Sequence, residues 1–209
     1  MGRLIMVLGS KPISAAFVAL ALAHPSVVLA AGPVDEAYIK SLAAAGKTIL
    51  VIEYYDGATI ASRRGYQSAT GFRAASALDL RVDDKTILRL FGVEPCRGDM
   101  VNRRENFSGS CSDFGQKYLQ IMLKSPKVIL CRAYVSQENE PRQDATCFGY
   151  YSYPGVLDSV DNFEEQLLSI GALRLAKKQD GSPMRADLVE AEKIGRLGYG
   201  MWADPRTEP

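Results

Sequence analysis

The sequence predicts an α+β protein that is mainly β, with one small closed barrel of five strands and about three helices. Two observations support this class. After a short lead-in helix, runs of β-branched and aromatic residues alternate with polar turns, and one helical pattern interrupts them before two more helices follow. The composition, 47% hydrophobic and 23% charged over 209 residues, excludes collagen-like, coiled-coil and disordered chains.

Before residue 113 the sequence predicts one helix, three strands and two loops. The helix covers 34–45, where apolar residues recur at helical spacing until Gly46 ends it. The strands are rich in β-branched and aromatic residues; they are expected at 47–55, 77–82 and 86–93. Polar segments without an apolar period predict long loops, at 61–77 and 94–112.

After residue 113 the pattern changes to helix, two strands and two helices. These elements are expected from Phe114 to Ser125, at 127–135 and 145–153, and at 161–170 and 186–197. The two strands flank a polar turn, so they are expected to pair. Antiparallel strands interrupted by one helix are typical of a small closed barrel of the OB type.

Residues 1–30 have the pattern of a secretory signal. They begin with basic residues and no acid, continue with the apolar run 13–23, and end in small or aliphatic residues before Ala31. The alternative is an uncleaved anchor, but the apolar run is shorter than the roughly 20 residues of a spanning helix. We therefore expect a secreted or periplasmic protein with no stable membrane insertion after cleavage.

Cleavage after Ala30 divides the chain into four parts. These are the signal peptide 1–30, a helical lead-in 31–46, one domain over 47–204 and a tail over 205–209. The remaining 179 residues are enough for one real core. Cleavage removes two basic residues and no acid, so the net charge changes from +1 to −1 and argues neither for nor against an anionic partner.

The only histidine, His24, lies inside the predicted signal. The remaining chain therefore has no imidazole, which excludes Ser-His-Asp, Cys-His and histidine-ligated metal chemistry.

Four cysteines follow the signal, and an even number in an exported chain indicates two disulfides. Three connectivities are possible. The spacing favours sequential closure, Cys96 with Cys111 and Cys131 with Cys147, because the second pair lies on two strand-like runs joined by a turn. No CxxC motif is present, which disfavours zinc and thioredoxin-like sites.

Three segments resemble the staphylococcal-nuclease-like (thermonuclease) domain family. Arg89-Leu-Phe-Gly-Val-Glu94-Pro95 resembles its strand signature Arg-Leu-x-Gly-(Ile/Val)-Asp-x-Pro-Glu. Arg142-x-x-Ala-Thr-Cys147 resembles the strand after its second catalytic arginine, and 188–202 resembles its closing helix. The four cysteines also fall where secreted bacterial members carry them. The resemblance covers about residues 47–204 and implies the same OB-type barrel.

The resemblance implies a phosphodiesterase in which two aspartates hold calcium, a glutamate activates water and two arginines bind the phosphate. Hard cations prefer carboxylate oxygens, and guanidinium groups match the charge and shape of phosphate. Arg89 and Arg142 occupy the arginine positions, and Glu94 stands where the second aspartate is expected. The catalytic candidates are therefore Arg89, Arg142 and Glu94.

The rest of that pattern is incomplete. The turn expected as Asp-Gly-Asp-Thr is Asp56-Gly-Ala-Thr, so a methyl group replaces one metal-binding carboxylate, and Asp79 is the alternative ligand. The metal candidates are thus Asp56, Asp79 and Glu94. The glutamate base falls on Arg97, or on Cys96 if one residue is deleted, and neither can act as that base.

Further candidates are aromatic and basic. Tyr150, Tyr151 and Tyr153 are candidate substrate-binding residues, because barrel-mouth tyrosines can stack on bases; cross-strand packing is the structural alternative. Three basic pairs could line a nucleic-acid path or simply be solvated: Arg63-Arg64, Arg103-Arg104 and Lys177-Lys178.

Two functions follow. The favoured one is an exported nuclease-like module that has lost catalysis and binds single-stranded nucleic acid, another anionic ligand or an envelope protein. The alternative is a calcium-dependent secreted nuclease with a rebuilt site. The missing carboxylates favour the first, which needs no cofactor.

Overall fold

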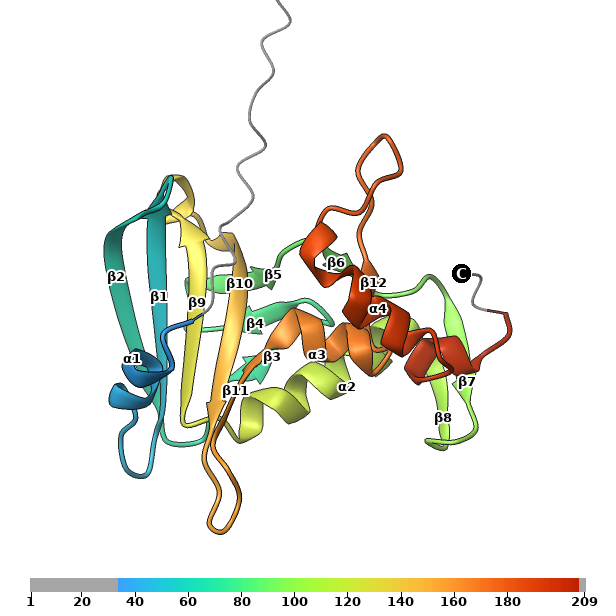
Figure 1. The fold of residues 1–209 in the computed structure, drawn as a ribbon, viewed down its shortest axis with the longest axis horizontal. Helices are drawn as coiled ribbons and strands as arrows, with labels where there is room; N and C mark the ends of the chain where they lie inside the picture. Colours follow the sequence, from blue (N-terminus) through green and yellow to red (C-terminus); the bar gives the residue numbers. More distant parts are fainter. Residues whose placement is uncertain (1–33, 207–209) are drawn as a thin grey trace, which may run out of the picture.

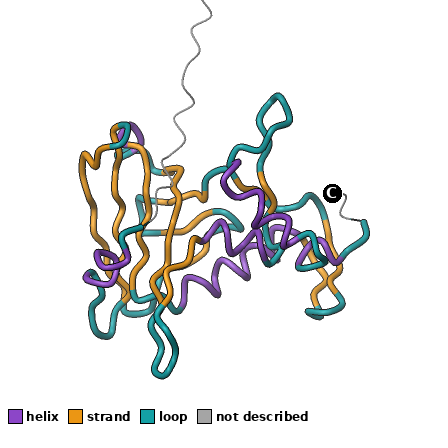
Figure 2. Tube along the Cα trace, in the orientation of Figure 1, coloured by secondary structure: helices purple, strands orange, loops and turns teal. Residues whose placement is uncertain are grey.

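The computed structural model describes residues 34–206 and has an α+β fold (Figure 1). The predicted signal peptide, residues 1–30, lies outside the described residues. A large sheet forms one side of the molecule, helices pack beside it, and a small hairpin lies at the far end (Figure 2). The predicted α+β class is confirmed.

The main sheet has eight strands in the order β2-β1-β9-β10-β5-β4-β3, with β11 paired to β10. The strands are β1 (Thr48–Asp56), β2 (Thr59–Ser68), β3 (Arg73–Ala74), β4 (Asp79–Arg81), β5 (Ile87–Leu90), β9 (Val128–Tyr134), β10 (Arg142–Tyr151) and β11 (Ser159–Asn162). The β1–β9 and β10–β5 pairs are parallel and the others antiparallel. Within residues 34–206 no pairing joins β2 to β3, so the predicted closed barrel of five strands is not confirmed.

Two shorter sheets extend the fold. They pair β6 (Val93–Glu94) with β12 (Arg174–Leu175), and β7 (Asp99–Asn102) with β8 (Phe107–Ser110). The β6–β12 pair connects the strand region to the C-terminal helices, and the β7–β8 hairpin lies at the far end of the molecule (Figure 1).

Helices cover both faces of the sheet. The main core lies between one face and the helices α2 (Cys111–Lys124), α3 (Phe163–Ser169) and α4 (Val189–Gly195). A smaller core lies under α1 (Glu36–Ser41) on the other face. The 3-10 helices are η1 (Val135–Gln137), η2 (Ala186–Leu188) and η3 (Gly200–Ala203). Among residues 34–206, no helix is long and apolar enough to cross a membrane.

The two-sided core explains the position of β1. Leu50, Ile52 and Tyr54 point into the main core, whereas Val51 packs in the smaller core under α1. A strand that is apolar on both faces belongs in the interior of a sheet. The lead-in helix is confirmed, although it is shorter than the predicted 34–45.

The two predicted loops contain strands. Most of 61–77 is β2 and β3, and the segment 94–112 contains the β7–β8 hairpin. β2 is an edge strand whose exposed and half-buried positions alternate, and three of its half-buried positions are polar, namely Ser62, Arg64 and Ser68. No apolar alternation therefore marks it in the sequence.

Both predicted disulfides are present, Cys96–Cys111 and Cys131–Cys147. The second joins directly opposed residues of β9 and β10. The first ties the segment after β6 to the start of α2.

Candidate functional site

The structure brings three predicted site residues together on adjacent strands. Asp79 on β4 lies opposite Arg89 on β5, and Asp144 on β10 lies on the other side of Arg89. Arg142 lies two residues before Asp144 and therefore on the same face of β10. We call Asp79, Arg89 and Arg142 the arginine face.

On this face, Arg142 holds the Asp79 carboxylate with two nitrogens. Its Nη2 lies 2.7 Å from Oδ1 and 2.8 Å from Oδ2, and its Nε lies 3.1 Å from Oδ1. The Ser76 hydroxyl also donates to Oδ2 at 2.7 Å. Both carboxylate oxygens of the buried Asp79 are therefore occupied by hydrogen-bond donors. This arrangement suits an ion pair and leaves no open carboxylate for a cation.

The other predicted metal ligands lie elsewhere. Glu94 on β6 accepts from Arg174, whose Nε and Nη2 lie 3.0 and 2.8 Å from its Oε1. Asp56 ends β1 in an exposed turn, and three strands separate β1 from the β4 strand of Asp79. In the described part of the chain, no three His, Cys, Asp or Glu side chains form a group that could hold a metal ion. The residues present do not fit a calcium site.

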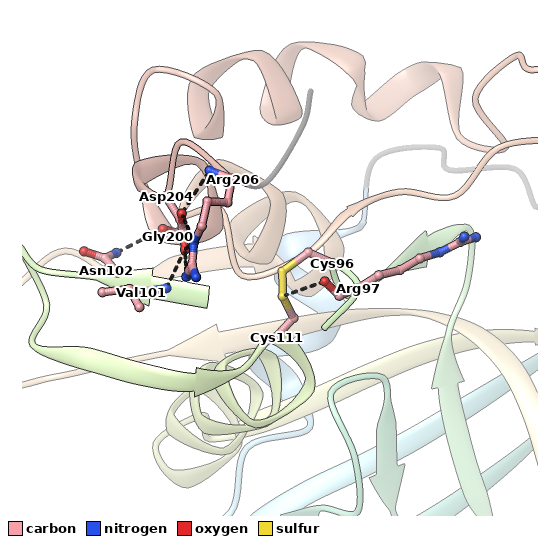
Figure 3. Close-up of polar contacts among 8 residues, drawn as sticks. All are labelled: Cys96, Arg97, Val101, Asn102, Cys111, Gly200, Asp204 and Arg206. Carbon is pink, nitrogen blue, oxygen red and sulfur yellow. Dashed lines mark hydrogen bonds and ion pairs between the residues drawn. A yellow bond between two sulfur atoms is a disulfide. The ribbon is translucent and has the colours of Figure 1, made fainter. Parts of the chain in front are cut away.

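Neither position considered for the catalytic glutamate offers a base. Cys96 is bonded to Cys111, whose Sγ lies 3.9 Å from the Arg97 carbonyl oxygen. Figure 3 shows the Arg97 side chain extending away from this disulfide. A disulfide sulfur and a guanidinium cannot remove a proton from water at neutral pH.

The three tyrosines do not form one stacking surface. Tyr150 is buried, and its hydroxyl donates to Asp158 Oδ2 at 2.8 Å. Tyr151 points to the opposite face of β10 and donates to the Met122 carbonyl, and its burial raises the pKa of its hydroxyl. Tyr153 is exposed and stacks on Tyr151. Packing explains the first two rings, and only Tyr153 presents a free face.

Three of the four arginines in the predicted pairs Arg63-Arg64 and Arg103-Arg104 have side-chain contacts within the fold. Arg63 pairs with Glu53 at 2.9 Å, and Arg64 with Glu138 at 3.0 Å. Arg104 donates to the Gly198 carbonyl oxygen. These contacts favour a structural role.

The end of the molecule near Arg103 and Arg104 is also tied together by polar contacts (Figure 3). Asp204 accepts from the Val101 amide at 2.7 Å and from the Arg206 side chain, which lowers the pKa of Asp204. The Asn102 side chain donates to the Gly200 carbonyl oxygen at 3.0 Å. These bonds attach the β7–β8 hairpin to η3.

The third basic pair leads to a site that the sequence analysis missed. Lys177 lines a cavity of about 420 Å³ between β6, β12 and α4, which we call the basic cavity. Its charged lining residues are Glu94, Arg97, Arg174, Lys177, Glu192 and Arg196. They are spread over about a hundred residues of sequence. Glu94, Arg97 and the Lys177-Lys178 pair were each considered from the sequence, but no local pattern connects them as one site.

A buried polar cluster lies at the base of the hairpin that carries Lys177. The Arg185 side chain is 1% exposed and lies against Glu164, which is fully buried. Arg185 also donates to Thr146 Oγ1 at 2.8 Å and to Asp187. Burial raises the pKa of Glu164 to about 7, although the nearby guanidinium opposes this shift. The cluster anchors the hairpin on β10 and α3.

Searches of protein-family models and of curated proteins found no match to this sequence.

Proposed function

We propose that this protein is an exported binding module on a nuclease-like fold, which binds an anionic ligand without hydrolysing it. This proposal rests on one observation: the carboxylates of Asp79 and Glu94 are already bound by donors of the protein itself. Asp79 is occupied by Arg142 and Ser76, and Glu94 by Arg174. Phosphodiester hydrolysis in this family pattern needs free carboxylates for a cation and a base.

We also propose that β3, β4, β5, β10 and β9 are the counterparts of the five strands of an OB-type barrel. These strands follow one another in the sheet. β1 pairs with the outer edge of β9, the edge at which a barrel of these five strands would close. The added β1–β2 hairpin accounts for an open sheet on this interpretation, and the turn at Asp56 is then not the counterpart of the family's metal-binding turn, so Asp79 takes that position.

The arginine face supplies the cations for a phosphate ligand. Arg89 is half-buried and has no ion pair or hydrogen bond of its guanidinium within residues 34–206. Arg142 keeps 49% of its side chain exposed while it holds Asp79. The face therefore offers one half-buried and one half-exposed guanidinium group to a phosphate ligand, and single-stranded nucleic acid is the ligand that we propose.

The test is a binding titration with a labelled single-stranded oligonucleotide. Affinity should fall as salt rises, because phosphate contacts release counterions. Arg89→Gln should weaken binding by roughly tenfold, since a charge-assisted hydrogen bond is lost. Lys124→Gln, at an exposed cation in the last turn of α2 and away from this face, is the control. If the affinity changes neither with salt concentration nor in the Arg89→Gln variant, the proposal is contradicted and an envelope protein becomes the favoured partner.

A calcium-dependent nuclease is the second candidate, because Asp79, Arg89 and Arg142 do lie on neighbouring strands. In that case Arg142 must release Asp79 when the cation binds. Calorimetry distinguishes the candidates: a rebuilt site requires calcium binding that both Asp79→Asn and Glu94→Gln abolish. We expect no calcium binding that depends on these two residues.

A further inference from the structure

We infer that the basic cavity is a binding site for a phosphate monoester that carries an apolar group. This inference goes beyond the proposed function, because none of the cavity residues belongs to the arginine face. It rests on the geometry of the walls, on their charges and on the apolar part of the lining.

The walls of the cavity are fixed by main-chain and side-chain bonds. β6 and β12 pair through Glu94 opposite Arg174 and Val93 opposite Leu175. The Leu175 amide donates to Glu192 Oε1 at 2.9 Å, which attaches α4 to β12. A hairpin closes the remaining side, where Lys177 forms a β-bridge with Pro183. The cavity is thus a built part of the fold.

Two of the basic residues that line the cavity form no ion pair with an acidic residue in the described part of the chain. The cavity has four basic and two acidic lining residues. Arg174 pairs with Glu94 at 2.8 Å, and Arg196 pairs with Glu192 at 3.3 Å. The side chains of Arg97 and Lys177 have no ion pair or hydrogen bond within the described residues. The lining therefore carries a net charge of +2, which comes from Arg97 and Lys177, because the other four charged residues form two ion pairs.

Arg97 owes its place in the cavity to the neighbouring disulfide. Cys96 is bonded to Cys111 at the start of α2, so the main chain at residue 97 is held against that helix. From this anchor the Arg97 side chain extends away from the disulfide (Figure 3). Arg97, which stands where the family resemblance expects the glutamate base, thus contributes a positive charge to the cavity.

The net charge and the apolar part of the lining indicate which class of ligand fits the cavity. A phosphate monoester carries about −1.5 to −2 at neutral pH, which matches two unpaired cations, whereas a diester carries one charge. Leu175, Pro183 and Val189 form an apolar part of the lining on which an organic group can pack. A volume of about 420 Å³ is within the usual range for small-molecule sites.

The experiment is a calorimetric titration of the full protein with phenyl phosphate, methyl phosphate and inorganic phosphate. Phenyl phosphate should bind at one site and more tightly than the other two, because only its ring covers the apolar wall. Arg97→Gln and Lys177→Gln should each weaken it by roughly tenfold. Lys178→Gln is the matched control, since Lys178 is the exposed neighbour on the same hairpin and does not line the cavity.

Unaltered melting temperatures in the three variants should show that each still folds, because all three side chains are exposed. No saturation at about 10 mM phenyl phosphate would overturn the inference. Equal losses in Lys177→Gln and Lys178→Gln would also overturn it, since they would indicate general charge screening.

A failure here is distinguishable from a failure of the proposed function. Arg89→Gln should weaken the oligonucleotide and leave phenyl phosphate unchanged. Phenyl phosphate binding without oligonucleotide binding supports the cavity site and contradicts the proposed function, whereas the reverse result overturns the cavity site alone.

Discussion

Asp79 on β4 accepts hydrogen bonds from Ser76 and from Arg142, which lies two strands away on β10. The carboxylate is nearly buried, whereas half of the Arg142 side chain is exposed, so solvent weakens the pair but does not remove it. Asp79→Ala should therefore lower the free energy of unfolding by about 1–2 kcal/mol.

Chemical denaturation measures this loss. Asp84→Ala, in the exposed turn between β4 and β5, is the control and should change stability by less than about 0.5 kcal/mol. Equal effects of the two substitutions would mean that the Asp79–Arg142 pair contributes no stability.

Glu164 provides a second test at the level of one residue. Its pKa is raised from 4.5 to about 7 by burial, so between these pH values the folded protein holds a proton that the unfolded chain has lost. The contribution of this group to the free energy of unfolding therefore decreases as pH rises through this window. Glu164→Gln removes the titration, and its unfolding free energy should vary less steeply over the same pH range.

Denaturant titrations of both proteins between about pH 4.5 and 8 measure the difference in slope. If the two proteins show the same pH dependence, Glu164 does not titrate in this window and the Arg185 charge holds it ionised.

Helices and strands are predicted well from the sequence where their buried side makes apolar residues recur at regular spacing. α2 begins where Ser110 caps the Asp113 amide, and β9 and β10 are apolar strands joined by a disulfide. β2 leaves no apolar period in the sequence, because three of its five half-buried positions are polar. Short pairs such as β6–β12 depend on segments about eighty residues apart, which local patterns do not connect.

The contact between α3 and α4 depends on a glycine. A Cβ at Gly195 would lie 2.2 Å from the Leu168 carbonyl oxygen, so a side chain there would force the two helices apart. Gly195→Ala should destabilise the protein by about 3 kcal/mol.

Gly65 in β2 is the matched control, because nothing lies within 4 Å of an added Cβ. Gly65→Ala should be neutral or slightly stabilising, as alanine restricts the unfolded chain more than glycine does. Comparable melting temperatures for the two variants would show that the helices can separate at little cost.

For the molecule as a whole, the sequence singled out Arg89 and Arg142, whose strands prove to be neighbours, but it did not indicate which arginine each acid contacts. The resemblance implies that Arg89 and Arg142 bind the same phosphate, and their strands β5 and β10 do pair. Glu94, in the position of the family's second aspartate, and Asp79, the alternative to Asp56, are both candidate metal ligands, yet each is held by a different arginine. The partner of a charged side chain is set by tertiary contacts and leaves no periodic signal.

The central claim is that the arginine face binds single-stranded nucleic acid and does not cut it. The most direct measurement incubates excess protein with an end-labelled single-stranded oligonucleotide and calcium, and resolves the products on a denaturing gel. We expect the oligonucleotide to be bound and to remain full length. Fragments that a chelator and Arg89→Ala both abolish would contradict the account and establish a calcium-dependent nuclease.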